Sequence, residues 1–260
     1  MIDDHRTTVF PLLQSVVTIN DQAVKTDAAA MNGGATLAFA ANGGPIDEVA
    51  LDVPGDQLSN VALTAGGFYC YSLCGQIGSN SVTVELAEPA DDLSWTSYGF
   101  WDSLDARSET VATFVTGYKT ADSNVPTSGS ATYNGSVVGK VIFPDAGAHG
   151  VGVYYLNGDV SLAANFGSGS ITGNLTNMTS GQGPWNSVSL LGSISGSQNA
   201  FSGTSAATSA PANAAAMSGS ASGTFAGMFF GPSAQELGAV WTLFDGSSTA
   251  TGSFGAKTGP

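Results

Sequence analysis

The best-placed group of reactive side chains lies in the stretch GAHGVGVYYLNG, residues 147–158. It places His149 in a glycine-rich segment a few residues before Tyr154 and Tyr155. Imidazole is a common axial ligand of haem iron, and tyrosines can stack on a bound group or hydrogen bond to it, so this stretch could bind a haem or a metal ion. The alternative is a solvent-exposed loop histidine followed by two tyrosines that pack at the start of a strand.

A second pair of reactive side chains, Cys70 and Cys74, lies in FYCYSLCG with three residues between them. A zinc site would need further Cys or His nearby, and the two histidines, His5 and His149, are far away in the sequence. The pair either closes a small disulfide loop in an oxidising compartment or remains as two thiols in a turn. A loop this short gains little from closure entropy.

The carboxylates give no catalytic pattern. Glu236, in FFGPSAQELGAVWTLF, has no second acid beside it in the sequence of the kind that a glycosidase pair requires. With two histidines, few serines or cysteines can have a general base within reach. The acids Asp47, Glu48, Asp52 and Asp56 do not fit a calcium-loop spacing and are better explained as solvated charge. We therefore expect no enzyme.

The charge balance excludes several classes of partner. The chain has 20 acidic and six basic residues, a formal net charge of −14, and basic residues that occur singly. Nucleic-acid and anionic-membrane binding depend on clustered Lys and Arg, so both are excluded. No stretch of about 18 uninterrupted apolar residues occurs, so we expect no transmembrane helix.

The N-terminal residues do not resemble an export signal. MIDDHRTTVFPLLQSVVTIN begins with acids, and Pro11 and Gln14 interrupt its apolar run. No cysteine of the lipidation type follows. If the protein is exported, we therefore expect the signal to lie outside this sequence or the export route to be unusual.

The elements that must position these residues are strands. The chain has 35 glycines and many Ser, Thr, Asn and Ala residues, with apolar residues at alternating positions, a pattern typical of all-β proteins. The turn-rich stretch SNVPTSGS, residues 123–130, separates an acidic first part from a glycine-punctuated second part. We expect an N-terminal β-rich domain over residues 1–125 and a second domain over residues 126–260.

The second part reads as five hairpin-like units in succession, beginning with SATYNGSVVGKVIF. In DVSLAANF, Val160, Leu162 and Ala164 fall on one face, and the FGSG that follows is typical of a tight turn. A meander of about eight strands has two unpaired edges unless it closes. The sequence therefore predicts an eight-stranded antiparallel up-and-down barrel, which we expect to be filled by bulky side chains.

Two further stretches belong to this second part of the chain. Trp185, in GQGPWNS, could present a hot-spot side chain to a protein partner, or it could cover one end of the barrel. TSAATSAPANAAAMSGS, residues 204–220, predicts a long loop, with a short helix as the alternative. In TSYGFWDSL, the alternating Tyr98, Phe100 and Trp101 indicate packing between the two domains.

Several motifs resemble those of the transferrin-binding-protein-B-like surface proteins of Gram-negative bacteria. They are SGSATYNGSVVGK, GDVSLAANFGSGSITGNLTNM, GTFAGMFFGPSAQELGAVW and the terminal GSFGAK. SYGFW and TFVTGYKT are similar to motifs of the smaller handle sheet that precedes such barrels. The resemblance covers roughly residues 95–260. It implies that the Pro232, Ala234, Glu236 and Gly238 motif is a structural connection, whose carboxylate accepts backbone N–H bonds in a tight turn.

The resemblance also implies a role. It suggests a non-enzymatic binding protein of the bacterial cell surface or exterior, with a protein or haem ligand and with nutrient iron capture through loops. Some relatives of this architecture bind haem, which adds to the interest of His149, Tyr154, Tyr155 and Trp185 as ligand-binding residues. The alternative is a structural or adhesive component of a surface assembly, in which the N-terminal segment mediates self-association.

Overall fold

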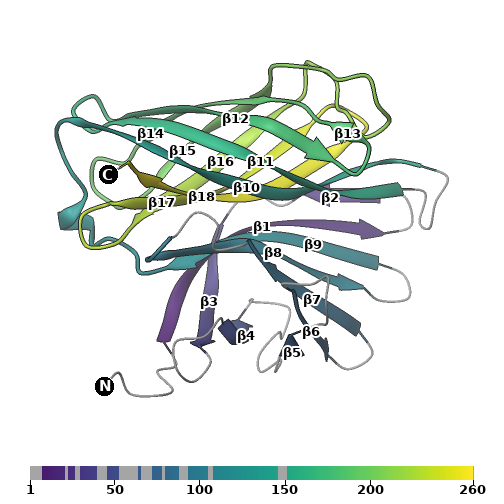
Figure 1. The fold of residues 1–260 in the computed structure, drawn as a ribbon, viewed down its shortest axis with the longest axis horizontal. Helices are drawn as coiled ribbons and strands as arrows, with labels where there is room; N and C mark the ends of the chain where they lie inside the picture. The colour runs from purple at the N-terminus through teal and green to yellow at the C-terminus, as the bar shows by residue number, and fades with distance from the viewer. Residues whose placement is uncertain are drawn as a thin grey trace.

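The computed structural model describes residues 8–20, 23–26, 30–39, 46–52, 64–65, 72–77, 80–87, 93–104, 108–145 and 151–259. These residues form two antiparallel β-structures that follow one another along the chain (Figure 1). One is an open sheet and the other is a closed barrel. The all-β prediction is confirmed.

The open sheet contains the N-terminal strands in the order β4-β3-β1-β9-β8-β7-β6-β5, and β2 pairs with β1. Its strands are β1 (Thr8–Asn20), β2 (Ala23–Thr26), β3 (Ala30–Phe39), β4 (Ile46–Asp52), β5 (Thr64–Ala65), β6 (Ser72–Ile77), β7 (Asn80–Leu86), β8 (Thr96–Leu104) and β9 (Ser108–Gly117). Residues 111–117 of β9 are all buried, so both faces at the centre of the sheet are covered.

The barrel contains the remaining strands in the order β11-β10-β18-β17-β16-β15-β14-β12, and β11 also pairs with β12. Its strands are β10 (Ser130–Pro144), β11 (Val151–Asn165), β12 (Ser170–Ser180), β14 (Val188–Ile194), β15 (Phe201–Ala207), β16 (Ser222–Phe230), β17 (Glu236–Phe244) and β18 (Thr249–Thr258), and the short β13 (Gly183–Pro184) pairs with β12. Within the described residues, these eight long strands close on themselves, because the first strand β10 pairs with the last strand β18. The predicted eight-stranded up-and-down barrel is confirmed.

The barrel interior is filled by side chains. Val160, Leu162 and Ala164 of β11 are at most 2% exposed, as their alternation predicts. Trp241 and Phe225 are among the largest fully buried side chains in the barrel core. Aromatic and branched residues that point inward from every long strand thus leave recognition to the outer surface and the loops.

Two of the five expected hairpins supply one barrel strand each. SATYNGSVVGKVIF belongs to the single 15-residue strand β10, so its Asn-Gly is not a turn. A Cβ atom at Gly135 would lie 2.1 Å from the carbonyl oxygen of Gly255, so this glycine permits close approach of β18. The fourth expected unit, AAAMSGSASGTFAGMFFG (residues 214–231), likewise contains only β16, preceded by a loop.

The long predicted loop spans residues 208–221 and covers one end of the barrel. Asn186 fastens it, since its Nδ2 donates to the carbonyl oxygen of Met217 (2.9 Å) and its Oδ1 accepts from the Met217 N–H (2.8 Å). Met217 and Ala215 are buried in the barrel core. The helical alternative for this stretch is wrong.

The open sheet lies against the outer wall of the barrel (Figure 1). Tyr98 donates to or accepts from Ser136 (2.6 Å between Oη and Oγ), and Ser253 Oγ donates to the Gly99 carbonyl (2.7 Å). Tyr98 and Phe100 face the barrel as expected, whereas Trp101 points to the other face, where its Nε1 donates to Gln14 Oε1 (3.4 Å). The described residues contain no helix of the length and apolar character that a membrane span requires.

The predicted domain boundary falls between β9 and β10, in the segment of residues 118–129. This segment contains a short 3-10 turn, Asp122–Asn124. The division into a domain of residues 1–125 and a domain of residues 126–260 remains our proposal.

Candidate functional site

A polar junction lies at the barrel end where the chain passes from the open sheet to the barrel. Three segments meet there: the connection after β9, the turn between β14 and β15 (residues 195–200), and the turn between β16 and β17 (residues 231–235). The connection starts at Gly117, whose φ of 138° and close approach to the Trp95 carbonyl both require glycine. The Lys119 backbone then forms a β-bridge with Phe230.

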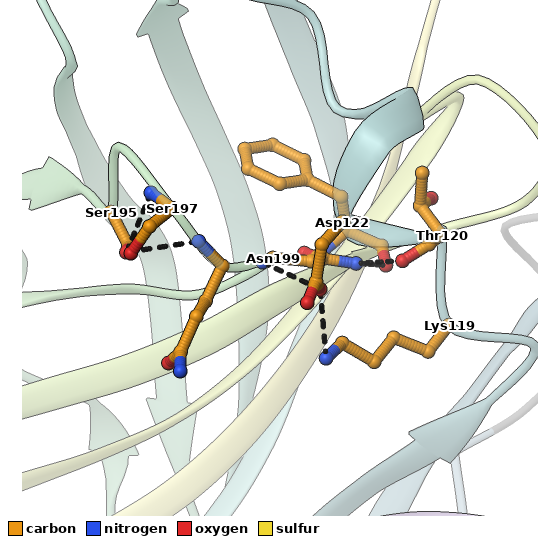
Figure 2. Close-up of polar contacts among 8 residues, drawn as sticks. Lys119, Thr120, Asp122, Ser195, Ser197 and Asn199 are labelled. Carbon is orange, nitrogen blue, oxygen red and sulfur yellow. Dashed lines mark hydrogen bonds and ion pairs between the residues drawn. The ribbon is translucent and has the colours of Figure 1, made fainter.

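Asn199 is the centre of this junction (Figure 2). Its side chain is 2% exposed, and its Nδ2 donates to the carbonyl oxygens of Thr120 and Phe229, both at 2.7 Å. Its Oδ1 accepts from the Phe229 N–H at 2.8 Å. One buried amide thus binds the backbone of two separate segments, which fixes the turn relative to the barrel wall.

The charged residues of the junction are Lys119 and Asp122. Their side chains form an ion pair of 3.2 Å, and Asp122 Oδ1 also accepts from the backbone N–H of Asn199 at 2.9 Å (Figure 2). The Asn199 N–H and the Lys119 ammonium hold the pKa of the Asp122 carboxyl below its ordinary value of 3.8. Asp122 is therefore ionised near neutral pH.

A groove of about 520 Å³ opens beside this junction. Lys119 and Asp122 line one side, Ser195 and Gln198 come from the β14–β15 turn, and Ser202 and Met228 lie on neighbouring strands. The lining thus offers an ammonium, a carboxylate, an amide and hydroxyls next to an apolar patch. These groups can hydrogen bond to a peptide segment or another polar ligand, and no group of three or more His, Cys, Asp or Glu residues gathers anywhere in the described part of the chain to hold a metal.

The structure does not bring the predicted tyrosines together. Tyr154 stacks on Phe143 (5.3 Å between ring centroids) and its hydroxyl accepts from Gln182 Nε2 at 2.7 Å. Tyr155 is 52% exposed and lies near Phe100 of the open sheet. Consecutive strand residues point to opposite faces, so the two rings do not converge on one ligand in this arrangement, and binding by either remains a prediction.

Trp185 lies in the barrel core, 2% exposed. Its Nε1 donates to the Ala215 carbonyl (2.9 Å), and its ring lies 6.1 Å from that of Trp241. This placement favours the alternative in which Trp185 covers one end of the barrel. A ligand-binding role for it stays a prediction.

His149 and Cys70 lie outside the described residues, and Cys74 lies in β6 without a described side chain. Haem binding by His149 and a disulfide between Cys70 and Cys74 therefore remain predictions. Asp47, Glu48 and Asp52 lie in β4, also without described side chains, and Asp56 lies outside the described residues.

Glu236 has the structural role that the sequence predicts, but with different donors. Its side chain is 3% exposed, and its Oε1 and Oε2 accept from the backbone N–H groups of Ser94 (2.6 Å) and Trp95 (3.0 Å). These donors are more than 140 residues away, at the entry to β8. The carboxylate therefore fastens the open sheet to the barrel rather than shaping a local turn.

The groove was not predicted from the sequence. Asn199 and Gln198 occur in SGSQNAF, which indicates a turn and nothing more specific. Asp122 stands more than 70 residues earlier, so its contact with this turn depends on the closure of the barrel.

Comparison with protein families finds a match over residues 125–258 to the family described as the C-lobe and N-lobe β-barrels of Tf-binding protein B. The matched region begins in the connection beside the groove and ends within β18. Comparison with curated proteins finds no match.

Solved structures of similar fold include a transferrin binding protein B variant from Haemophilus parasuis Hp5, with a TM-score of 0.59, 18% identity, and coverage of 95% of this chain and 45% of that chain. Transferrin binding protein B from serogroup B Neisseria meningitidis gives a TM-score of 0.54, 18% identity, and coverage of 95% and 44%. The haemoglobin receptor HpuA from Kingella denitrificans gives a TM-score of 0.50, 16% identity, and coverage of 95% and 87%. The chain thus spans about half the length of the transferrin-binding structures that it matches.

Proposed function

Because this chain belongs to the family of transferrin-binding protein B β-barrels, we propose that it is a non-enzymatic binding protein of the bacterial cell surface. Its role is the capture of a nutrient ligand. That ligand is iron, either carried by a protein or in the form of haem. The family match over residues 125–258 is the observation that carries this proposal. Members of the same fold are named for binding transferrin or haemoglobin, which supports an iron-carrying partner.

The filled barrel directs the proposal to its surface. Side chains occupy the interior, so a ligand must bind to loops or to the outer wall. The groove beside Lys119 and Asp122 is concave, combines polar groups with an apolar patch, and is bounded by hydrogen-bonded turns. Pre-organised turns of this kind lose little conformational entropy on binding, which favours them as a recognition surface.

The test is binding of the full chain to iron-loaded transferrin, iron-free transferrin, haemoglobin and free haem, each measured separately. We expect a saturable interaction with one of these probes. Failure of all four to bind would overturn the proposal of iron capture. Sizing of the free chain over a range of concentrations tests the structural alternative, since an assembly component would form polymers as its concentration rises.

Two matched variants locate the binding surface. Ser202→Trp places a bulky ring in the groove, and Thr204→Trp places the same ring two residues along the exposed face of β15, outside the lining. We expect Ser202→Trp to weaken binding at least tenfold and Thr204→Trp to leave it within about twofold. Equal affinities for the two variants would show that the groove is not the recognition surface.

A separate variant tests haem binding by His149. If haem binds, the predicted ligand His149 is tested by His149→Ala, with absorbance in the Soret region as the measurement. We expect the variant to lose the Soret band shift. An unchanged spectrum would exclude His149 as the axial ligand.

A further inference from the structure

A second polar cluster lies where the open sheet meets the barrel, apart from the groove. Lys140 of β10 is 4% exposed, and its Nζ lies 2.5 Å from Oδ2 of Asp102 on β8. The same Nζ lies 5.0 Å from the centroid of the Phe100 ring and 4.7 Å from that of Tyr155. An amine and a carboxyl group are thus in direct contact between aromatic rings.

A second carboxyl group stands beside this pair. On β7, Thr83 is the partner of Asp102 and Glu85 is the partner of Phe100, so Glu85 lies on the same face of the sheet, diagonal to Asp102. Burial raises the pKa of the Glu85 carboxyl, which also feels the charges of Lys140 and Asp102. Burial likewise raises the pKa of the Asp102 carboxyl, against the opposing effect of Lys140.

The arrangement is costly as a simple ion pair. Among the residues that the structure describes, Asp102 Oδ1 is buried and has no hydrogen-bond partner, so within this part of the chain the carboxylate is only half satisfied. A buried pair gains little from its Coulomb attraction unless the remaining acceptors are also bonded. Transfer of the proton from Nζ to the carboxyl group would replace two buried charges by a neutral amine and a neutral acid, which are the reactants of amide formation.

We propose that Lys140 and Asp102 condense to an intramolecular amide bond that joins barrel strand β10 to strand β8 of the open sheet. The lone pair of the neutral Nζ attacks Cγ of the protonated Asp102, and a C–N bond forms. The C–O bond to one carboxyl oxygen then breaks, and that oxygen leaves as water. The net change converts one ammonium and one carboxylate into one amide and one water, with no oxidation or reduction.

Glu85 is the proton-transfer group in this step. Its carboxylate accepts a proton from the attacking nitrogen and returns it to the departing hydroxyl, which is general acid–base catalysis by a group of raised pKa. The barrel and the sheet hold the amine against the carboxyl group, so the reaction is favoured by proximity. The aromatic rings limit the access of water, which disfavours hydrolysis of the product.

The intact mass of the purified, folded full chain tests the bond directly. We expect the wild-type chain to be lighter than its sequence requires by the mass of one water molecule. Lys140→Arg keeps a cation beside Asp102 but lacks the amine, and it should match its sequence mass. A wild-type chain of full mass, or a Lys140→Arg chain that also lacks one water, would overturn the proposal.

Trypsin locates the bond. Arg107 and Lys119 lie between Asp102 and Lys140, so digestion of the denatured chain separates the two residues unless an amide joins them. We expect a branched product that contains residues 26–107 and residues 120–257, because cleavage after an acylated Lys140 is also lost. Separate release of the peptide that ends at Lys140 in the wild type would contradict the proposed link.

Glu85→Gln tests the proton transfer. This variant keeps the size of the side chain, so circular dichroism should show the wild-type fold. We expect it to retain full mass, or to lose water at least tenfold more slowly than the wild type after refolding. Condensation at the wild-type rate would exclude Glu85 as the proton-transfer group.

Discussion

Two carboxylates, the buried Glu236 and the largely buried Asp102, connect the open sheet to the barrel, and their surroundings differ. Glu236 has both oxygens bonded to backbone N–H groups, whereas Asp102 contacts an amine through one oxygen, and no described residue bonds to the other. The two contacts lie at different positions along the barrel wall. Strand β18 shows this, because its residue Lys257 pairs with Glu236 and its residue Thr251 pairs with Lys140. A satisfied carboxylate serves only to hold two segments together, whereas an unsatisfied one beside an amine is suited to react.

The largest expected effect comes from Lys140→Arg. An amide between residues 38 positions apart restricts the unfolded chain as a disulfide does, and its loss should lower the free energy of unfolding by about 4 kcal/mol. Urea denaturation of the two proteins measures the difference. Lys257→Arg, a substitution of the same kind on β18, is the control. Coincident curves for Lys140→Arg and the wild type would remove the contrast between the two carboxylates.

Glu236→Ala should have the next largest effect. It removes the acceptor of two charge-assisted hydrogen bonds, and because Ser94 and Trp95 are partly exposed, water can replace part of the loss. We expect a decrease of about 2 kcal/mol in the free energy of unfolding, and about half as much for Glu236→Gln, which keeps one oxygen acceptor. Equal losses in the two variants would indicate a packing role instead of a hydrogen-bonding one.

Two buried threonines of β9 contrast a hydroxyl that bonds across the sheet–barrel interface with one on the opposite face of the sheet. Thr113 Oγ1 lies 3.0 Å from Thr251 Oγ1 across the interface, whereas the equally buried Thr116 Oγ1, on the other face of the sheet, has no hydrogen-bond partner within the described part of the chain. Thr113→Val should therefore cost about 1 kcal/mol, and Thr116→Val should be neutral or stabilising. Thermal denaturation compares the two. A larger loss for Thr116→Val would show that side-chain shape, and not hydrogen bonding, decides stability there.

The barrel could be predicted from the sequence because its determinants are local. The alternation of Val160, Leu162 and Ala164 assigns a face to β11, and a meander with that pattern has to close. The unit SATYNGSVVGKVIF was expected to form a hairpin and is one strand, since a glycine that permits close strand approach, such as Gly135, has the same local appearance as one in a hairpin.

The contacts between the open sheet and the barrel could not be predicted in the same way. Glu236 was expected to be structural, but its donors Ser94 and Trp95 are brought to it by the docking of the sheet on the barrel. Lys140 and Asp102 stand in separate strands of separate sheets, and no spacing rule relates them. Such pairs depend on register and on the packing of two elements, which the alternation of one strand does not fix.

The smallest expected effect is a difference in the pH dependence of stability between Asp122, beside the groove, and Glu85, in the cluster with Lys140 and Asp102. The pKa of Asp122 is lowered by the Asn199 N–H and Lys119, so Asp122 stabilises the fold above its unfolded pKa of 3.8, and this contribution is lost as the pH falls through its folded pKa. Asp122→Asn should therefore be less stable than the wild type near pH 6, and the gap should close in acid.

Glu85 should show the opposite sign. Burial raises its pKa above 4.5, so ionised Glu85 costs stability at neutral pH, and the cost disappears as the pH falls through its folded pKa. In a Lys140→Arg background, where no amide forms, Glu85→Gln should be more stable than its parent at pH 7 and equal to it below pH 4.5. Denaturation midpoints measured over this range compare both pairs. The same sign of pH dependence for Asp122 and Glu85 would contradict the distinction between a hydrogen-bonded carboxylate and a desolvated one.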